Sequence, residues 1–445
     1  MVSSVHIFTI NRSRDGVWLN STVAFRIDSH SGARDLAFLG KLRDFMREQS
    51  RNYRVLLTRS TIASFLTQLV QNFNSLYIVE LGATPFQLSA VRAIGSAVSA
   101  LVSIPAGWLS DVYSLKKIMI LGMILQVLSV ALYAFAQDWM WIVAAMIFAT
   151  LTMTLVFRMQ NIFIANSLSD RNRATGYAMR TTVMQFFSIF APTIGGIIVY
   201  LFGGISVQGI RPLFYIQLVG FSVISLYVAL NLEDVETRGV FQPSELIGHY
   251  REMFQTGENL GRFAFIQALG AATWGMSMPF PFIYAAEFKG ADSLIIGYMG
   301  TCYVLVSMLM AIPMGNLADS RGRKFTIYVT RPFFYASYLL LVLSPPGTSW
   351  VLLLAWCCRG VVMSSSAWMT MSMEMVPREF RGRWTGFISL LQNLIRVPAM
   401  LLGGYLYESV NPALVFIFPI FVDALIRIPI LRTIPDTVKP LDKTQ

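Results

Sequence analysis

Runs of apolar residues separated by short polar breaks occupy the chain from about Val55 to Leu431. A helix needs about 20 apolar residues to cross a bilayer core of about 30 Å, and the runs have that length. We therefore predict twelve transmembrane helices. They are expected at residues 55–80, 87–109, 117–136, 140–166, 175–203, 211–231, 261–286, 293–316, 325–344, 350–373, 385–407 and 412–432.

A longer polar stretch with many charged residues divides these spans into two sets of six. In the N-terminal extension, Leu36, Leu39, Leu42 and Phe45 recur among basic residues, a spacing typical of an amphipathic helix on a membrane surface or of a solvated helix. The predicted organisation is an extension (1–53), a first six-helix bundle (54–231), a connector (232–260), a second six-helix bundle (261–432) and a tail (433–445).

Composition supports an all-α membrane protein. Of the 445 residues, 55% are hydrophobic and 13% are charged, which is more apolar surface than one soluble core can bury. The three histidines lie outside the predicted spans and the three cysteines inside them, without metal-ligand or nucleophile spacing. The sequence also lacks a phosphate-binding loop of the Gly-x-x-x-x-Gly-Lys-Ser/Thr type. We therefore expect no enzyme, no metal and no cofactor, and transport driven by an ion gradient.

Positive charge is concentrated in every second loop, which is the pattern of cytoplasmic loops in membrane proteins. The basic loops share a side with both termini and the connector, and the opposite loops contribute little more than Arg211 and Lys289. We predict a multi-pass protein of the cell (plasma) membrane with both termini in the cytoplasm. The net charge of +11 then reflects cytoplasmic loops of a protein embedded in the lipid bilayer, and we expect no nucleic-acid partner. The basic loops are at residues 116–117, 171–173, 321–324 and 378–383.

The two halves of the chain repeat a pattern at an offset of 208 residues. An Ile-Pro-x-Gly-x-x-x-Asp segment ends an even-numbered span in each half, once with Gly107 and Asp111 and once with Gly315 and Asp319. Basic residues follow in both copies. Parallel repeats of this kind are typical of transporters whose binding site lies between the halves.

The second copy, Gly315-Asn-Leu-Ala-Asp319-Ser-Arg-Gly322-Arg323-Lys324, resembles the signature loop of the major facilitator superfamily. The first copy keeps the glycine, the aspartate and the basic residues but lacks the inner glycine. This resemblance implies the major facilitator fold, with two six-helix bundles related by pseudo-twofold symmetry, a monomer, and alternating access to a cavity lined by spans 1, 4, 7 and 10. Charged residues at the ends of the spans would then gate the cavity, unless they only cap loops and set the topology. The gating candidates are Gly107, Asp111, Lys116, Lys117, Arg171, Gly315, Asp319, Gly322, Arg323, Lys324 and Arg381.

Polar residues inside apolar spans indicate a cavity or hydrogen bonds between helices. The first span carries a polar stripe at helical spacing from Ser60 to Asn74, and the fourth, seventh and tenth spans carry comparable faces. Methionines crowd the same spans, as they do at sites for varied hydrophobic ligands. The predicted substrate-binding residues are Gln68, Gln71, Asn74, Thr154, Arg158, Gln267, Trp274, Ser277, Arg359, Ser366 and Trp368.

Three readings of the function stay open. Arg158 and the Ala191-Pro-x-x-Gly195-Gly196 segment resemble marks of drug antiporters, which favours proton-coupled efflux of small hydrophobic or amphipathic molecules. Deep arginines outnumber deep acids, which favours an organic-anion or nutrient symporter or exchanger. A membrane-embedded enzyme or receptor is the third reading. Glu374, Asp423 and Glu80 are the candidates for proton coupling, although Arg427, four residues after Asp423, predicts a neutral structural pair there.

Overall fold

The computed structural model describes residues 9–14, 17–22, 49–112, 114–168, 173–234, 259–377 and 380–437. Side chains are described in these ranges from residue 49 onward, except at 103–112, 158, 165, 173 and 174. The amphipathic helix expected at 36–47 lies outside the described residues. Near the N-terminus, β1 (Thr9–Arg14) and β2 (Val17–Thr22) pair antiparallel, with Thr9 opposite Thr22. The apolar pattern of the sequence does not predict this hairpin.

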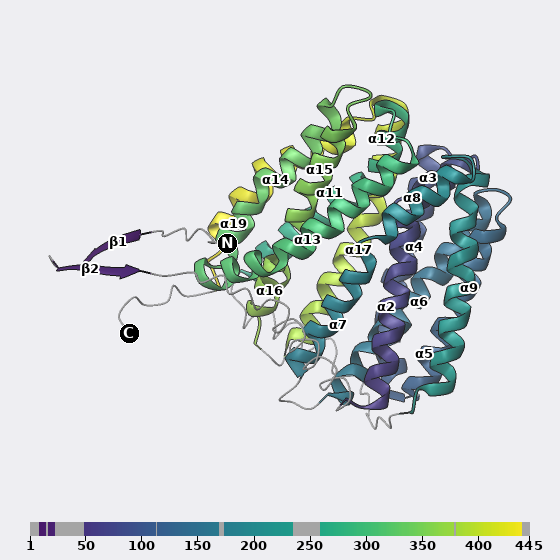
Figure 1. Cartoon of the computed structure of the whole chain (residues 1–445), viewed down its shortest axis with the longest axis horizontal. Helices are drawn as coiled ribbons and strands as arrows, with labels where there is room; N and C mark the ends of the chain where they lie inside the picture. Colours follow the sequence, from purple (N-terminus) through teal and green to yellow (C-terminus); the bar gives the residue numbers. More distant parts are fainter. Residues whose placement is uncertain are drawn as a thin grey trace, which may run out of the picture. The chain divides into compact units, whose positions relative to one another are not determined.

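All predicted spans are present as helices in the body that begins at Arg51 (Figure 1). Ten spans are long and apolar enough to cross a membrane by themselves, judged over the described residues. The first and seventh do not meet that criterion, and both carry polar stripes. In the first half the helices are α2 (Arg51–Gln71), α3 (Asn74–Glu80), α4 (Pro85–Val112), α5 (Leu115–Phe135), α6 (Met140–Ser167), α7 (Arg173–Ser188), α8 (Ala191–Leu201) and α9 (Val207–Asn231).

The second half repeats this order. Its elements are α11 (Leu260–Ser277), α12 (Pro281–Lys289), α13 (Ser293–Arg321), α14 (Arg323–Leu343), α15 (Ser349–Ser364), α16 (Ala367–Glu374), α17 (Arg381–Tyr405), the π-helix η3 (Leu406–Val410), α18 (Leu414–Val422), the π-helix η4 (Asp423–Arg427) and α19 (Ile428–Thr433). Most helix boundaries lie within a few residues of the predicted ones.

Several spans are broken near their middle. Pro281 and Pro192 follow the breaks in the seventh and fifth spans, because proline cannot donate the helical hydrogen bond and its ring clashes with the preceding turn. The tenth span breaks at Ser365, between α15 and α16. Breaks of this kind are tolerated at membrane depth where the backbone is buried in protein or lines a cavity.

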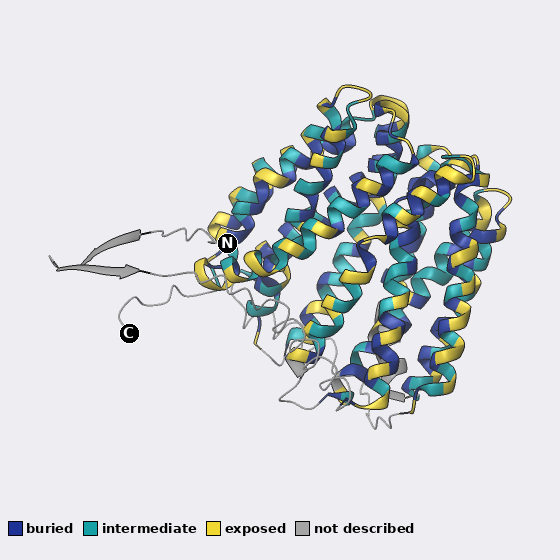
Figure 2. Cartoon of the chain, viewed as in Figure 1, coloured by how far each residue is buried: buried dark blue, intermediate teal, exposed yellow. Residues whose placement is uncertain are grey.

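The two ends of the bundle differ in their packing. We call the end that carries Arg51, Asn231 and Leu260 the connector end, and the opposite end the far end. At the far end both halves share one hydrophobic core, which includes Phe73 from the first half and Phe280 from the second. Elsewhere each half has its own core, one within residues 66–224 and the other within 260–434 (Figure 2).

Hydrogen bonds between the halves follow the same division. Among the described residues, one such bond, from Asn393 Nδ2 to the Ser99 hydroxyl at 3.2 Å, lies near the middle of α17 and α4, and the others lie in the far-end part of their helices. Examples at the far end are Asn72 Nδ2 to the Ile296 carbonyl at 3.0 Å, and the Thr193 and Thr301 hydroxyls at 2.6 Å. The α8 and α13 helices can approach closely because Gly196 has no side chain. A Cβ at this position would lie 2.6 Å from the Ser293 carbonyl oxygen. The halves are therefore joined at the far end.

Candidate functional site

Three cavities lie along the inner faces of the halves. The C-cavity, of about 490 Å³, is lined by the second half alone, from Gln267 to Arg427. The central cavity, of about 170 Å³, lies between the halves, with Gln68 and Gln71 on one side and Arg359 on the other. The N-cavity, of about 570 Å³, is lined mostly by the first half.

Shared walls connect these cavities. Trp274 and Tyr338 line both the C-cavity and the central cavity. Ser389 and Arg396 line both the C-cavity and the N-cavity. Because α16 and the first turns of α17 also line the C-cavity, it reaches from mid-bundle toward the connector end.

The cavity walls are electropositive. Among the lining residues that the structure describes there are five arginines and no aspartate or glutamate. A guanidinium stays charged at any physiological pH, so each of these side chains holds its charge inside the membrane region. The arginines are Arg92, Arg331, Arg359, Arg396 and Arg427.

Arg359 is the most isolated of these charges. It is 8% exposed, and its Nη1 has no hydrogen-bond partner. Instead, the guanidinium carbon lies 4.6 Å from the ring centre of Trp274 and 4.9 Å from that of Tyr338. Cation–π contacts orient the group but leave its donors free. Arg359 can therefore offer a charge-assisted hydrogen bond to an anion in the central cavity.

Arg92 and Arg396 are only partly satisfied. Arg92 donates from Nη2 to the Asn74 side chain at 2.7 Å, and Arg396 makes a long contact of 3.5 Å to Asn393 Oδ1. In both residues the Nε atom is buried without a partner. Hydrogen bonding to neutral amides holds these guanidinium groups in place without neutralising them.

Arg331 and Arg427 differ, because they share one carboxylate. Asp423 is fully buried and accepts bonds from Arg331 Nη1 at 3.1 Å and Arg427 Nη1 at 2.7 Å. Tyr335 donates to the same carboxylate at 3.0 Å. The ion pair expected between Asp423 and Arg427 is thus present, with a second arginine that our sequence analysis did not assign to it.

Most predicted binding residues with described side chains line a cavity. Ser277 does not, since it is fully buried and bonded to the Tyr338 hydroxyl at 2.6 Å. Ser366 is exposed and is absent from the described cavity walls. The Arg158 side chain lies outside the described part of the chain. The lining residues are Gln68, Gln71, Asn74, Thr154, Gln267, Trp274, Arg359 and Trp368.

The polar stripe of the first span has two roles. Ser60 accepts a bond from Arg180 Nε at 3.0 Å and one from Gln160, and Ser64 bonds to Ser188 at 2.7 Å. These residues join helices, as the alternative reading of the stripe expected. Residues nearer the far end, from Thr67 onward, line the cavities.

The gating candidates of the second half form a network within that half. Arg323 pairs with Asp319 at 2.5 Å and with Glu374 at 2.9 Å, which links α13, α14 and α16. Gly322, between α13 and α14, has a φ of +99°, a conformation that favours glycine. Arg381 donates to the Met373 carbonyl at 3.0 Å. Gly315 is in the α13 helix.

In the first half, Gly107 is in the α4 helix and Lys116 and Lys117 are in the first turn of α5, while the Asp111 side chain and Arg171 lie outside the described residues. Of the proton-coupling candidates, Glu80 is exposed at the end of α3, and neither it nor Glu374 or Asp423 is among the described cavity-lining residues.

Two carboxylates that our sequence analysis missed cap helices in equivalent places. Asp436, just after the last helix, accepts bonds from the Arg323 and Lys324 amides at the start of α14. Asp234, just after the sixth span, accepts bonds from the Lys116 amide and the Ser114 hydroxyl at the start of α5. A negative charge at a helix N-terminus is favourable. The signal in the sequence is an acidic residue a few positions beyond the last apolar residue of each half.

The model of the Major Facilitator Superfamily matches residues 56–254 and 263–444. Among solved structures, a mutant of the nucleoside transporter NupG is similar with a TM-score of 0.72 and 12% sequence identity, over 86% of this chain and 100% of that chain. A POT family transporter in complex with a thioalcohol-conjugated peptide gives 0.65 and 15%, over 86% and 96%. The POT family transporter PepTSo gives 0.68 and 11%, over 86% and 98%. No curated relative matches the chain.

Proposed function

Because the chain belongs to the Major Facilitator Superfamily, we propose that it is a secondary active transporter that carries small organic anions by alternating access. One observation carries the choice of substrate: the described cavity walls hold five arginines and no carboxylate. Uncompensated charge at membrane depth is costly and usually marks a substrate pathway. An anionic substrate would supply the missing negative charge.

The substrate also has a flat or apolar part in this proposal. Trp274 and Tyr338 present their rings to Arg359, and both line the same cavities. An anion that binds Arg359 therefore meets aromatic surface beside it. An aromatic or otherwise apolar carboxylate satisfies both features, whereas an inorganic anion would leave the rings without contacts.

We place the connector end in the cytoplasm, following the positive charge of its loops, in the plasma membrane and as a monomer. The halves are joined at the far end and have separate cores toward the connector end. This arrangement supports an inward-facing conformation, with the gating candidates of the second half paired within their own half. Closure of the connector end would complete the transport cycle.

Exchange of one anion for another is our proposal for the energy source. An empty cavity that closed would bury guanidinium groups away from water without partners, at a cost of several kcal/mol per ion. A bound anion removes that cost, so the loaded carrier crosses more easily than the empty one. Proton coupling through Glu374, Asp423 or Glu80 would have to act from outside the described cavity walls.

Proton-coupled efflux of hydrophobic molecules is the second candidate. It is favoured by Met363, Met369 and Met373, which line the C-cavity and provide adaptable apolar surface. Against it stands the charge of the same walls, because a hydrophobic cation would be repelled by the arginines. A neutral hydrophobic substrate would leave them unpaired.

The test compares matched acids and methyl esters. Purified protein is screened by thermal shift against aromatic carboxylates, their methyl esters and hydrophobic cations of similar size, and the best acid is then tested for counterflow into liposomes. We expect stabilisation by acids alone, and uptake of labelled acid that requires unlabelled acid inside. Stabilisation by the esters or the cations, or uptake driven by a pH gradient with no internal acid, would instead support efflux or proton coupling.

A further inference from the structure

Guanidinium groups and aromatic rings alternate along the inner wall of the second half. The Phe334 ring centre lies 5.9 Å from the Arg359 guanidinium carbon and 5.3 Å from that of Arg331. The Trp368 ring centre lies 5.6 Å from Arg331 and 4.8 Å from Arg427. The Arg359 and Arg331 guanidinium groups therefore lie near each other, both in contact with the Phe334 ring.

Charge along this row is not balanced. Asp423 lies against Arg331 and Arg427, and among the described residues it is the one carboxylate paired with any of the three arginines. Asp423 is fully buried and is not among the described residues that line the cavities. Two arginines on one carboxylate leave one positive charge at that end of the row, and unpaired Arg359 leaves another at the other end.

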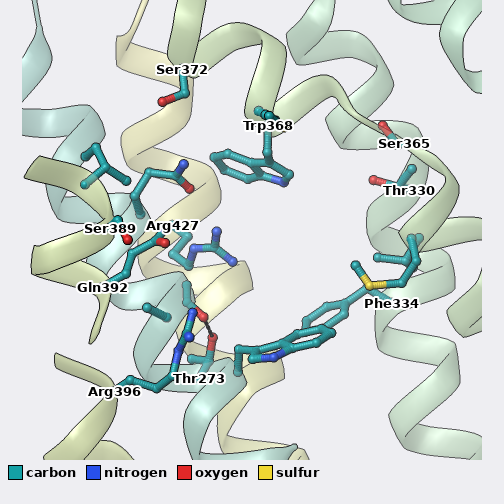
Figure 3. Close-up of a pocket in the computed structure, with 18 of the residues that line it drawn as sticks. Thr273, Thr330, Phe334, Ser365, Trp368, Ser372, Ser389, Gln392, Arg396 and Arg427 are labelled. Atoms are coloured by element: carbon teal, nitrogen blue, oxygen red, sulfur yellow. Dashed lines mark hydrogen bonds between the residues drawn. The ribbon is translucent and has the colours of Figure 1, made fainter. Parts of the chain in front are cut away.

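The end with the shared carboxylate faces the C-cavity. Figure 3 shows the Arg427 guanidinium projecting into the cavity between Trp368 and Thr273, with Gln392 and Ser389 on the neighbouring wall. Its Nε donates to the Ile266 carbonyl at 3.0 Å and its Nη1 to Asp423, so the group is held in a fixed orientation. Asp423 acts as a positioning residue for a cation that a ligand can reach.

We propose that Arg427 and Arg331 form a second anion subsite, so that the substrate class is a dicarboxylate whose two charges are separated by a flat apolar spacer. One carboxylate binds Arg359 in the central cavity, and the other binds the Arg427 end of the C-cavity. Trp274 and Tyr338, which line both cavities, contact the spacer. This inference rests on the proposed function, because it assigns Arg359 the first carboxylate.

Pairs of probes that differ by one charge test the proposal. Each pair is an aromatic dicarboxylate and its monomethyl ester, with terephthalate, naphthalene-2,6-dicarboxylate and biphenyl-4,4′-dicarboxylate as spacers of increasing length. Binding to the purified full chain is measured by isothermal titration calorimetry at pH 7.5. For at least one spacer we expect the diacid to bind about 10- to 100-fold more tightly than its ester, the effect of one further charge-assisted contact.

The variant for this test keeps the buried charge balanced. Arg427→Gln removes the extra positive charge, leaves Arg331 and Asp423 as a neutral ion pair, and keeps an amide that can donate to Asp423. We expect this variant to bind diacid and ester equally, with the affinity for the ester unchanged. Arg262→Gln, at an exposed position on α11, serves as the control and should keep the preference.

The outcomes separate the two proposals. If acids bind in a way that depends on Arg359 but no diacid exceeds its ester, or if the Arg427→Gln variant keeps the preference, the second subsite is refuted and the proposed function stands. If neither member of any pair binds, both proposals fail. Should the Arg427→Gln variant prove unstable, Trp368→Leu in the intact network must still weaken diacid binding selectively, since it removes the ring that contacts both Arg331 and Arg427.

Discussion

Replacement of Arg359 by methionine gives a sharp test, because it should harm binding without harming the fold. Methionine has a similar length and a thioether that packs well on aromatic rings. The Trp274, Tyr338 and Phe334 rings around the guanidinium would keep an apolar partner. The change removes the charge and the buried Nη1 that has no hydrogen-bond partner.

The magnitudes can be set against each other. Removing the unsatisfied charged donor should favour the variant by about 1–3 kcal/mol. Because Arg359 is buried, each lost cation–π contact costs about 2 kcal/mol, but the variant also avoids the desolvation cost of several kcal/mol for an unpaired buried charge. These terms nearly cancel, so thermal stability without ligand should be unchanged or raised. Anion binding loses a buried charge contact worth about 2–5 kcal/mol, a decrease of roughly 30- to 4,000-fold in affinity.

Arg427→Met is the matched comparison. It removes another buried arginine of the second half but leaves Asp423 with a single ion-pair partner. Breaking a buried ion pair costs about 3–5 kcal/mol. Thermal unfolding of both variants in detergent, together with calorimetric titration of the best acid from the screen, completes the assay. Our reasoning is refuted if Arg359→Met unfolds as easily as Arg427→Met, or if it binds the acid as the unmodified chain does.

Further substitutions test the fold and the gate. Gly196→Leu places a side chain against the α13 backbone, where even a Cβ would be 2.6 Å from a carbonyl oxygen. The two halves should therefore separate at the far end, and spin labels on their far-end loops should report a longer distance between the labels. Glu374→Gln removes a charged partner of Arg323, and should change the counterflow rate while leaving the affinity for the acid unchanged. Equal rates would argue against a gating role. Ser277→Ala deletes the bond to the Tyr338 hydroxyl, and should lower unfolding stability by about 0.5–1.5 kcal/mol and raise KM. A variant with normal KM would show that Tyr338 needs no such support.

Much of the fold could be predicted, because the bilayer fixes the length and polarity of each span. The last span was expected at 412–432, and its helices run from Leu414 to Thr433. The seventh span, expected at 261–286, runs from Leu260 to Lys289. The hairpin at 9–22 was missed because its strands are short and are not part of the apolar pattern. The break at Ser365 was missed because no proline or glycine adjoins it.

Most of the cavity-lining residues could be predicted from their polarity within apolar spans, but the pairings among the site residues could be predicted only where they are local in sequence. Asp423 and Arg427 are four residues apart, and so their pairing follows from the helical period. Arg331 comes from another span and reaches the same carboxylate only through the packing of α14 against the last span, which no spacing reveals. Ser277 is a similar case. Its polarity suggested the cavity, yet its hydroxyl is bonded to Tyr338 behind the cavity wall.

In the proposed function, the charges that bind the substrate can also couple its binding to the conformational change. In the proposed cycle, closure of the connector end would surround the arginines with protein and exclude water from the cavities. A guanidinium without a partner opposes that step, and a bound carboxylate removes the opposition. A ligand shifts a conformational equilibrium only by its differential affinity for the two states. An anion that binds more tightly in the closed, drier cavity than in the open one meets that condition. In the proposed mechanism, Arg359 therefore both binds the substrate and makes closure depend on the substrate.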